Sequence, residues 1–361
     1  MAWCTPLGSD LDSTWRDLCA GRTAFDHHTS PFPLRNDLAA AIPDAAQDLR
    51  ERQLTITANT LRAACADAGI DPADPAITPI LGTSYAHHLD TPGTTSLHHW
   101  ARESARRAGH RNEPITVTTA CSAGADSLLI GAELIRAGTH DTCVCGGADI
   151  LTTAKRLGHS ALGTMSPTTL RAFDEHHDGM LLGEGAAFLV LESARSAHLR
   201  QARTHALLTG AGSANDAAGM TAPDTSGTSI RLAIHRSLTG TGLTTADIAV
   251  INAHATGTPL NDTVEEATLA ALFTEHPPPV FATKGALGHS LGATGAIEAV
   301  STVLALRDQL APPIAATTTP ATALPLVLGR PHAFNGTAGL SITLGFGGFN
   351  TSLLFTRNGD A

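Results

Sequence analysis

The chain has 361 residues, of which 42% are apolar and 16% charged, and its formal net charge is −10. This composition supports a large buried core and excludes a disordered or fibrous protein, while the length predicts about two domains. The acidic balance argues against non-specific nucleic-acid binding, and no apolar stretch approaches the ~18 residues that a membrane-spanning helix needs.

The N-terminus lacks a basic segment followed by an apolar one, so we expect no secretory signal and a cytoplasmic protein. Six cysteines are scattered along the chain, and we expect them to be reduced thiols. Cys143 and Cys145 lie in an apolar alternation without a second cysteine pair or a suitably spaced histidine. We therefore interpret them as strand residues rather than metal ligands.

Apolar runs and helical patterns alternate from end to end, which predicts an α/β fold. In chain order, the first half is predicted to contain a helix at 55–68, strands at 77–81 and 115–118, a helix at 121–136, and strands at 144–150 and 186–191. Gly138 follows the second of these helices, at the usual position of a helix C-cap.

A tract rich in Gly, Asp, Thr and Pro, residues 210–227, is predicted to be a loop between two domains, 1–205 and 206–361. Beyond it we expect a helix at 229–238, a strand at 248–252, a turn and helix over 284–307, and strands at 340–344 and 351–355. The last two strands flank Gly345-Phe346-Gly347-Gly348, which predicts a hairpin turn. No short-period repeat is present, but both halves share a rhythm of strand, tight turn and helix.

Cys121 lies in Thr119-Ala120-Cys121-Ser122-Ala123-Gly124, where a predicted strand meets a predicted helix. A free thiol is only a few per cent ionised at neutral pH, and a helix N-terminus favours its thiolate. Backbone N–H groups at such a junction can also hold a developing oxyanion, and small neighbours leave room for an acyl group. Taken alone, a cysteine in such a turn is more often a small buried residue.

His254 follows the predicted strand 248–252, where ligands of α/β sheets bind. Lys284 is the only lysine of the C-terminal half and precedes His289 in a glycine-rich turn that lacks phosphate-loop spacing. Without the other motifs, we would interpret Lys284 as a surface lysine and Glu298 as a solvated helix residue. Several of the other histidines occur in doublets, whose adjacent side chains point in different directions, and we interpret most of the other histidines as solvated loop residues.

Together these motifs resemble the beta-ketoacyl-acyl-carrier-protein synthases, the condensing enzymes of the thiolase superfamily used in fatty-acid and polyketide assembly. The matching segments are Thr119-Ala120-Cys121, Asn252-Ala253-His254 with Thr256 and Thr258, Lys284 with Gly288-His289 and Gly292-Ala293, and Gly345-Phe346-Gly347-Gly348. Each motif is weak alone, but they occur in the family's order and cover nearly the whole chain. The two histidines resemble the elongating branch, and Cys121 argues against the inactive chain-length-factor branch.

The resemblance implies a five-layered α/β/α/β/α fold of two similar halves with the site between them. It implies a decarboxylative Claisen condensation, in which acyl-Cys121 and malonyl-acyl carrier protein give a 3-oxoacyl product and carbon dioxide. The expected partners are acyl carrier protein and a second subunit, in a homodimer or a heterodimer with a related chain. No metal, nucleotide or other cofactor is expected, because the carrier's phosphopantetheine bears the substrates.

The family's roles are carried over residue by residue. Cys121 is expected to be the nucleophile, and His254 and His289 are expected to donate hydrogen bonds to the malonyl thioester carbonyl. The backbone N–H groups of Cys121 and Phe346 would form the oxyanion hole. Lys284 is expected to orient His289 electrostatically and to pair with Glu298.

The pocket residues are also implied by the resemblance. Thr256 and Thr258 match the hydroxyls that bind the phosphopantetheine arm, and Phe346 matches a phenylalanine that gates the acyl pocket. Gly347 and Phe349 belong to the same turn, where Phe349 replaces a small residue and could narrow the pocket. We interpret four arginines as a docking face for the acidic carrier or, equally, as a solvated helix face: Arg102, Arg106, Arg107 and Arg111.

Two departures from the family pattern stand out. The first strand is predicted to be short or missing, because Thr5-Pro6-Leu7-Gly8 follows the initiator almost at once. The segment before Cys121 is shortened, which affects the expected dimer interface and acyl tunnel. Two alternatives stay open: an acyltransferase or cyclase that uses Cys121 without extending the chain, and a non-catalytic subunit that shapes a partner's pocket.

Overall fold

The first half of the chain forms one mixed five-stranded sheet in the computed structural model, which describes residues 1–91, 93 and 96–358. Its strands, in sheet order, are β5 (Ile115–Val117), β4 (Ile77–Gly82), β6 (Thr142–Asp149), β7 (Gly185–Glu192) and β1 (Ala2–Cys4). The successive pairings are parallel, parallel, antiparallel and antiparallel. The predicted first strand is thus present and short, and it lies at one edge of the sheet.

The second half builds a sheet with the same plan. Its strands, in sheet order, are β10 (Val280–Phe281), β9 (Ile248–Asn252), β13 (Ala338–Gly345), β14 (Phe349–Thr356) and β8 (Leu207–Asn215). The pairings again run parallel, parallel, antiparallel and antiparallel. The shared strand, turn and helix rhythm of the sequence therefore reflects two similar halves.

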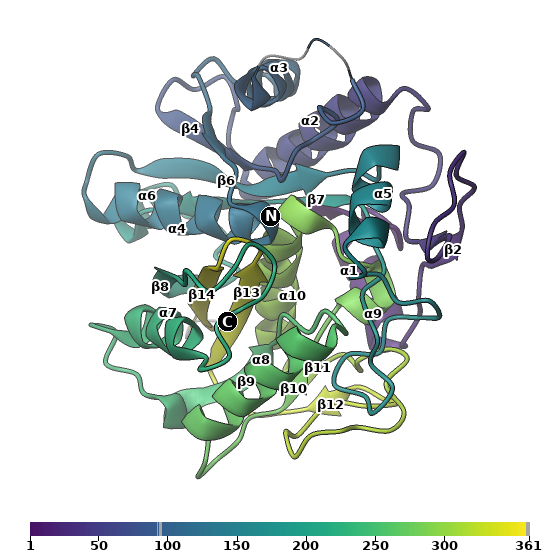
Figure 1. The fold of residues 1–361 in the computed structure, drawn as a ribbon. Helices are drawn as coiled ribbons and strands as arrows, with labels where there is room; N and C mark the ends of the chain where they lie inside the picture. Colours follow the sequence, from purple (N-terminus) through teal and green to yellow (C-terminus); the bar gives the residue numbers. More distant parts are fainter. Residues whose placement is uncertain (92, 94–95, 359–361) are drawn as a thin grey trace.

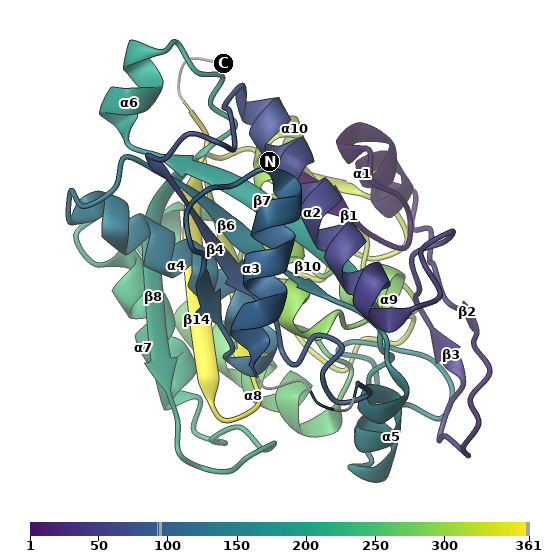
Figure 2. The ribbon, with the colours of Figure 1, turned by 90° about the horizontal axis from the view of Figure 1, so that it is seen from above.

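Five layers are visible in Figure 1: helices, a sheet, helices, the second sheet and helices. The layer helices, from the first outer layer to the last, are α2 (Leu49–Ala68), α3 (Leu97–Ala108), α4 (Ala123–Arg136), α10 (Thr294–Asp308), α7 (Thr228–Leu238) and α8 (Pro259–Leu272). Figure 2 shows α2 and α3 lying over the first sheet. This arrangement confirms the predicted α/β/α/β/α fold.

Shorter elements surround the layers. They are α1 (Leu11–Cys19), β2 (Asp26–His27), β3 (Leu38–Ala39), α5 (Thr153–Ala161), α6 (Ala194–Leu199), α9 (Lys284–Leu287), β11 (Leu310–Ala311) and β12 (His332–Ala333). None of the helices in the described part of the chain is both long and apolar enough to cross a bilayer.

The two central helices touch backbone to backbone. A Cβ atom added at Gly124 of α4 would lie 2.9 Å from the backbone nitrogen of Ala296 in α10. A Cβ added at Gly295 of α10 would lie 2.8 Å from the backbone nitrogen of Ala125 in α4. Only glycine permits this approach, and the helices bring together the turns that precede them in the two halves.

Most predicted elements are confirmed with shifted ends. The helix predicted at 55–68 begins earlier, at Leu49, because the Asp48 side chain accepts the Glu51 N–H at 2.9 Å as an N-cap. Strand β9 matches its predicted bounds. The helix predicted at 121–136 is divided into a 3-10 turn (Ala120–Ser122) and α4.

The prediction that 210–227 is entirely a loop is wrong, because β8 runs to Asn215. Gly210 and Gly212 belong to this strand for a packing reason. A Cβ at either glycine would lie within 2.3 Å of carbonyl oxygens of α7, those of Ser237 and Ala233. The glycines that suggested a loop instead let α7 lie close against the sheet. The domain division at 205/206 stays a prediction.

Candidate active site

Cys121 lies in the 3-10 turn between β5 and α4 and is 5% exposed. The residue before it, Ala120, has a φ of 51°, a left-handed conformation that costs energy for a non-glycine residue. The Asp126 carboxylate accepts hydrogen bonds from the Ser122 hydroxyl at 2.7 Å and from the Thr351 hydroxyl of β14 at 2.5 Å. Contacts from both halves thus hold the turn that bears Cys121 in its strained conformation.

The thiol of Cys121 is held neutral. Burial raises its pKa to about 11, although the backbone N–H of Phe346 donates to the sulfur and the positive charge of Lys284 opposes the rise. In the resting site, loss of hydration thus outweighs these stabilising contacts. The expected effect of the helix N-terminus on the thiolate stays a prediction. The proton must leave the sulfur as a bond to carbon forms.

His254 lies directly after β9, in a loop held by a carboxylate that the sequence analysis missed. Glu265 of α8 accepts the backbone N–H of His254 at 2.6 Å and that of Ala255 at 2.8 Å. Ala255 has a φ of 48°. The neighbouring Asp262 accepts the N–H of Gly257 at 3.1 Å, so one face of α8 fixes the whole loop.

His289 is oriented by its own turn. Its Nδ1 lies 2.9 Å from the Thr294 hydroxyl and accepts the backbone N–H of Leu291 at 3.3 Å. Leu291 has a φ of 48°, so a strained residue lies beside each of the three proposed catalytic side chains. Because Nδ1 accepts this hydrogen bond, the proton of neutral His289 is on Nε2.

Lys284 performs the equivalent task for His254. Its Nζ lies 3.2 Å from His254 Nδ1 and also donates to the His254 carbonyl and to Glu298. These three acceptors match the three donors of an ammonium group, so His254 also carries its proton on Nε2. The predicted ion pair with Glu298 is present. Lys284 therefore contacts His254 directly and acts on His289 only through its charge. Its expected electrostatic orientation of His289 stays a prediction.

The charges favour two neutral imidazoles. Burial lowers the pKa of His254 and of His289 well below 6.5, and the Lys284 charge lowers both further. Their rings lie edge to face with centroids 5.5 Å apart. Burial raises the pKa of Glu265 and of Glu298 to about 7, although the charge of Lys284 opposes the rise. The arrangement offers two N–H donors without an unpaired positive charge.

A cavity of about 310 Å³ connects the predicted residues. Its lining includes Cys121, His254, His289, Thr256, Thr258, Phe346 and Gly347. The hydroxyls of Thr256 and Thr258 lie 2.9 Å apart. Lys284 and Glu298 lie behind the wall. Phe349 does not line this cavity. It is the first residue of β14, and its ring packs against Gly347.

Three carboxylates that hold this site were missed. Asp262 and Glu265 are spaced i, i+3 on α8, a pattern that places both on the helix face toward the His254 loop. Asp149 ends β6 and accepts the N–H of Ser84 at 2.7 Å and of Gly292 at 3.0 Å, which ties the first half to the His289 turn. The i, i+3 spacing of Asp262 and Glu265 after the histidine motif was a sequence signal for their role. Nothing in the sequence marked Asp149.

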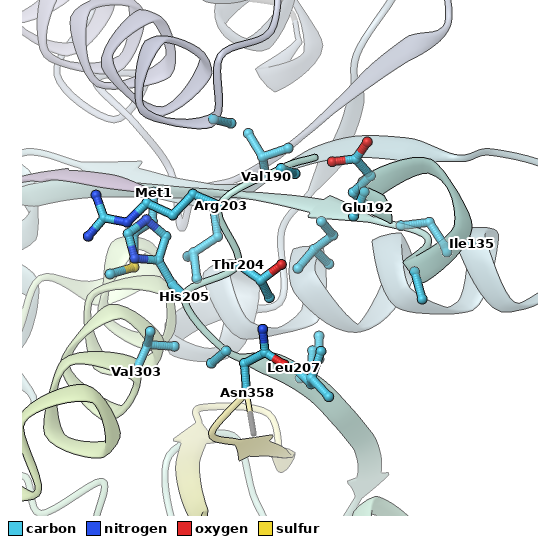
Figure 3. A pocket seen from close by; sticks show the side chains of 18 of the residues that line it. Met1, Ile135, Val190, Glu192, Arg203, Thr204, His205, Leu207, Val303 and Asn358 are labelled. Carbon is cyan, nitrogen blue, oxygen red and sulfur yellow. The ribbon is translucent and has the colours of Figure 1, made fainter. Parts of the chain in front are cut away.

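A second cavity, of about 880 Å³, lies at the far end of α4, where Ile135 and Arg136 end that helix. Figure 3 shows Arg203, Thr204 and His205 on the chain that crosses between the halves there. None of the predicted site residues lines it, so the smaller cavity is the candidate active site. In the described residues, no group of three or more His, Cys, Asp or Glu side chains is arranged to hold a metal ion.

Three of the four arginines proposed as a docking face are neutralised. Arg102 pairs with Glu113 at 2.9 Å, Arg106 with Glu103 at 2.9 Å, and Arg107 with Glu51 at 2.7 Å. Exposed pairs of this kind leave little net positive charge for an acidic partner. The solvated-face alternative is therefore the better description of α3.

Comparisons with known proteins agree with this geometry. Residues 1–197 match the family model "Beta-ketoacyl synthase, N-terminal domain", and residues 205–318 match "Beta-ketoacyl synthase, C-terminal domain". A curated relative, 3-oxoacyl-[acyl-carrier-protein] synthase 2 of Mycobacterium tuberculosis, is 36% identical over 253 residues. That match covers 67% of this chain and 61% of the relative, so it spans about three fifths of the relative's length. The Mycobacterium leprae synthase 2 is 35% identical over 251 residues, with 67% and 60% covered.

Solved structures cover nearly the whole chain. "The ishigamide ketosynthase/chain length factor" superposes with a TM-score of 0.90 at 29% identity, over 99% of this chain and 98% of that chain. A beta-ketoacyl synthase from Burkholderia phymatum gives 0.88 at 29% identity, with the same shares covered. The type II ketosynthase of "AntDE:AntF", at 21% identity and a TM-score of 0.89 over 99% of this chain and 97% of that chain, shares the fold.

Proposed function

The chain belongs to the beta-ketoacyl synthase family, and on this premise we propose that it extends a carrier-bound acyl chain by decarboxylative condensation. Cys121 takes the acyl group from one carrier-protein thioester. Malonyl-carrier protein then loses carbon dioxide, and its carbanion attacks the acyl carbon to give 3-oxoacyl-carrier protein. The observation that carries this proposal is the placement of Cys121, His254 and His289 around one cavity.

In the first step, the Cys121 sulfur attacks the thioester carbonyl and the carrier's thiol leaves. The proton lost by Cys121 ends on that departing sulfur, so the step is balanced without an external base. The Phe346 N–H, which rests on the Cys121 sulfur, can turn to the carbonyl oxygen as negative charge develops there. With the N–H of Cys121 it would form the oxyanion hole, and each such donor contributes roughly 3 kcal/mol.

In the second step, the Nε2–H groups of His254 and His289 would both donate to the malonyl thioester oxygen. As the carbon–carboxylate bond breaks, its electron pair moves onto this thioester and creates an enolate. Two donors held in fixed tautomers stabilise that charge more than they stabilise the neutral substrate. The enolate carbon then attacks acyl-Cys121, the Cys121 sulfur is expelled as a thiolate, and it takes up one proton from the solvent.

We propose that the Thr256 and Thr258 hydroxyls bind the phosphopantetheine arm, since both line the cavity. The carrier itself would dock over Arg35 and Arg171. Arg35 is exposed and reaches within 3.7 Å of the Cβ position of Gly163, which lines the cavity. Arg171 donates to the Thr168 hydroxyl at 2.9 Å. Neither arginine occurs among the ion pairs of the described residues. These guanidinium groups remain free to meet acidic side chains.

Charge reversal tests the docking surface. Arg35→Glu should raise KM for acyl-carrier protein several-fold at low salt and leave kcat nearly unchanged. Arg106→Glu on α3 is the control, because its guanidinium is already compensated by Glu103. Equal effects of the two variants would move the docking surface elsewhere.

We further propose that the chain pairs with a second copy or with a related subunit. The short strand β5 lies at one edge of the first sheet, and its outer side pairs with no strand in the described part of the chain. Such an edge is a natural place for another subunit. Light scattering of the purified chain, alone and with a related subunit, distinguishes the two forms. A monomer in both cases would overturn this part of the proposal.

Intact-protein mass spectrometry tests the condensation itself. Incubation with acyl-carrier protein should add the acyl mass to the wild type and not to Cys121→Ala. Addition of malonyl-carrier protein should then discharge the adduct into an extended 3-oxoacyl chain with release of carbon dioxide. An adduct that is never extended would indicate an acyltransferase or cyclase, and the absence of any adduct would indicate a pocket-shaping subunit. No metal or nucleotide is needed in the assay.

A further inference from the structure

A third histidine lies directly behind the wall of the catalytic cavity. His159, in the last turn of α5, stacks on the Phe346 ring with centroids 5.8 Å apart and planes 28° apart. Phe346 lines the cavity, and so does Thr164, whose hydroxyl lies 3.0 Å from His159 Nδ1. His159 itself does not belong to the described lining. It therefore contacts the cavity through two residues that do.

The hydrogen bonds fix the tautomer of His159. The Thr164 hydroxyl donates to the His159 carbonyl at 3.2 Å, so its oxygen accepts the proton on Nδ1. Nε2 is then an acceptor without a hydrogen bond to the described residues, and because His159 is partly exposed it does not count among the buried polar atoms that lack a partner. Burial and the charge of Lys155 lower the pKa of His159 to about 4, so Nε2 stays unprotonated at neutral pH.

This tautomer is opposite to that of the two catalytic histidines. His254 and His289 present N–H donors at Nε2, whereas His159 presents a lone pair. A donor in the substrate is the chemical partner of such a lone pair. A saturated hydrocarbon chain in the same position would leave it buried and unpaired, at a free-energy cost that reduces binding.

The size of the cavity connects His159 with the acyl chain. At about 310 Å³, the cavity is at the lower end of the ~300–1,000 Å³ typical of small-molecule sites. It must hold the carrier's arm and the group attached to Cys121. Phe346 is the largest side chain in the lining, its backbone N–H reaches the Cys121 sulfur, and it lies between Gly345 and Gly347. Displacement of its ring would enlarge the cavity and bring the chain against His159.

We propose that His159 selects acyl chains that carry a hydroxyl or enol O–H where they pass Phe346. This inference rests on the proposed condensation, because it assigns the substrate class of the same site. The O–H donates to His159 Nε2, and the imidazole stays neutral throughout. The enzyme would then prefer oxygenated intermediates of a growing chain to fully reduced ones of equal length.

The test compares carrier proteins loaded with octanoyl and with hydroxyoctanoyl chains that bear the hydroxyl at different carbons. The readout is the rate at which each acylates Cys121 in the full chain, followed by intact mass. Wild type should acylate with at least one hydroxylated chain about fivefold or more faster than with the saturated chain. His159→Phe keeps the stacked ring but removes the acceptor, and it should abolish or reverse this preference.

Two further variants complete the design. His159→Gln restores an acceptor near the position of Nε2 and should restore part of the preference. His198 lines the second cavity and not the catalytic one. The variant His198→Phe should therefore leave the preference at its wild-type value. Equal rates for all chains in wild type and in His159→Phe would overturn this inference and leave the condensation intact. No acylation of wild type by any chain would overturn both proposals.

Discussion

Nζ of Lys284 lies 3.2 Å from Nδ1 of His254, and the same ammonium pairs with the buried carboxylate of Glu298. Lys284→Met should therefore remove the group that fixes the His254 tautomer. We expect decarboxylation of malonyl-carrier protein to fall by about two orders of magnitude, a typical loss for one transition-state donor, while acylation of Cys121 is largely retained. The free energy of unfolding should fall by about 3–5 kcal/mol, because Glu298 loses its partner.

Arg52→Met is the matched control for this variant. Arg52 also forms a largely buried ion pair, with Glu184, and it contacts neither His254 nor His289. Its loss should lower stability similarly without changing the ratio of decarboxylation to acylation. A proportional loss of both activities in Lys284→Met would contradict the assigned role of Lys284.

Alkylation of Cys121 should accelerate as pH rises. Because burial raises the pKa of this thiol to about 11, the thiolate fraction at pH 7 is on the order of one in ten thousand. The rate of modification by iodoacetamide should thus rise about tenfold per pH unit between pH 7 and 10. Site-resolved mass spectrometry, with Cys121→Ala as the blank, measures it. A plateau near pH 8 would instead indicate a stabilised thiolate.

Glu265→Gln and Glu265→Ala should form a graded pair. The carboxylate accepts two backbone N–H groups of the His254 loop, so alanine leaves both without an acceptor, whereas glutamine keeps one. We expect the alanine variant to lose roughly 2–4 kcal/mol of stability and the glutamine variant less. Decarboxylation should decline in the same order. Thermal unfolding and carbon dioxide release provide the two readouts, and equal effects of both substitutions would refute this account.

The buried histidine of α3's C-terminal turn should make stability depend on pH. His110 is 6% exposed, and burial lowers its pKa to about 4. Below its unfolded pKa of about 6.5, the unfolded chain takes up a proton that the folded chain does not. Wild type should therefore lose about 2 kcal/mol relative to His110→Phe between about pH 7.5 and 5. Urea unfolding at the two pH values tests this, and a constant difference would be evidence against it.

Two helical glycines should respond oppositely to alanine. A Cβ at Gly131 of α4 would lie 2.3 Å from the Cys145 sulfur, whereas one at Gly158 of α5 meets nothing within 4 Å. Gly131→Ala should cost about 1–3 kcal/mol through overpacking, and Gly158→Ala should gain about 0.5–1 kcal/mol. Cys145→Ala should relieve much of the Gly131→Ala penalty. Melting temperatures check all three, and additive effects of the Gly131 and Cys145 changes would contradict the contact.

The sequence predicted what depends on local patterns and on motif order. Strand β9 is a short apolar run with clear ends, and Cys121, His254 and His289 follow turns that the motifs identify. Glu265 was missed although its spacing from Asp262 was a signal, because it acts on backbone groups of another segment. The role of Lys284 beside His289 was carried over from the family resemblance, and the fold adds a direct contact of its ammonium with the loop after β9.

The direct backbone contact between α4 and α10 determines how the two halves share the reaction. The spacing of the turns that carry Cys121 and His289 is set by main-chain atoms, since no side chain intervenes between Gly124 and Ala296. Side chains that change rotamer with temperature or substrate therefore leave this spacing unaltered. Substitutions in the acyl pocket around Phe346 can therefore change its shape while the distance between the Cys121 sulfur and the His289 imidazole stays constant.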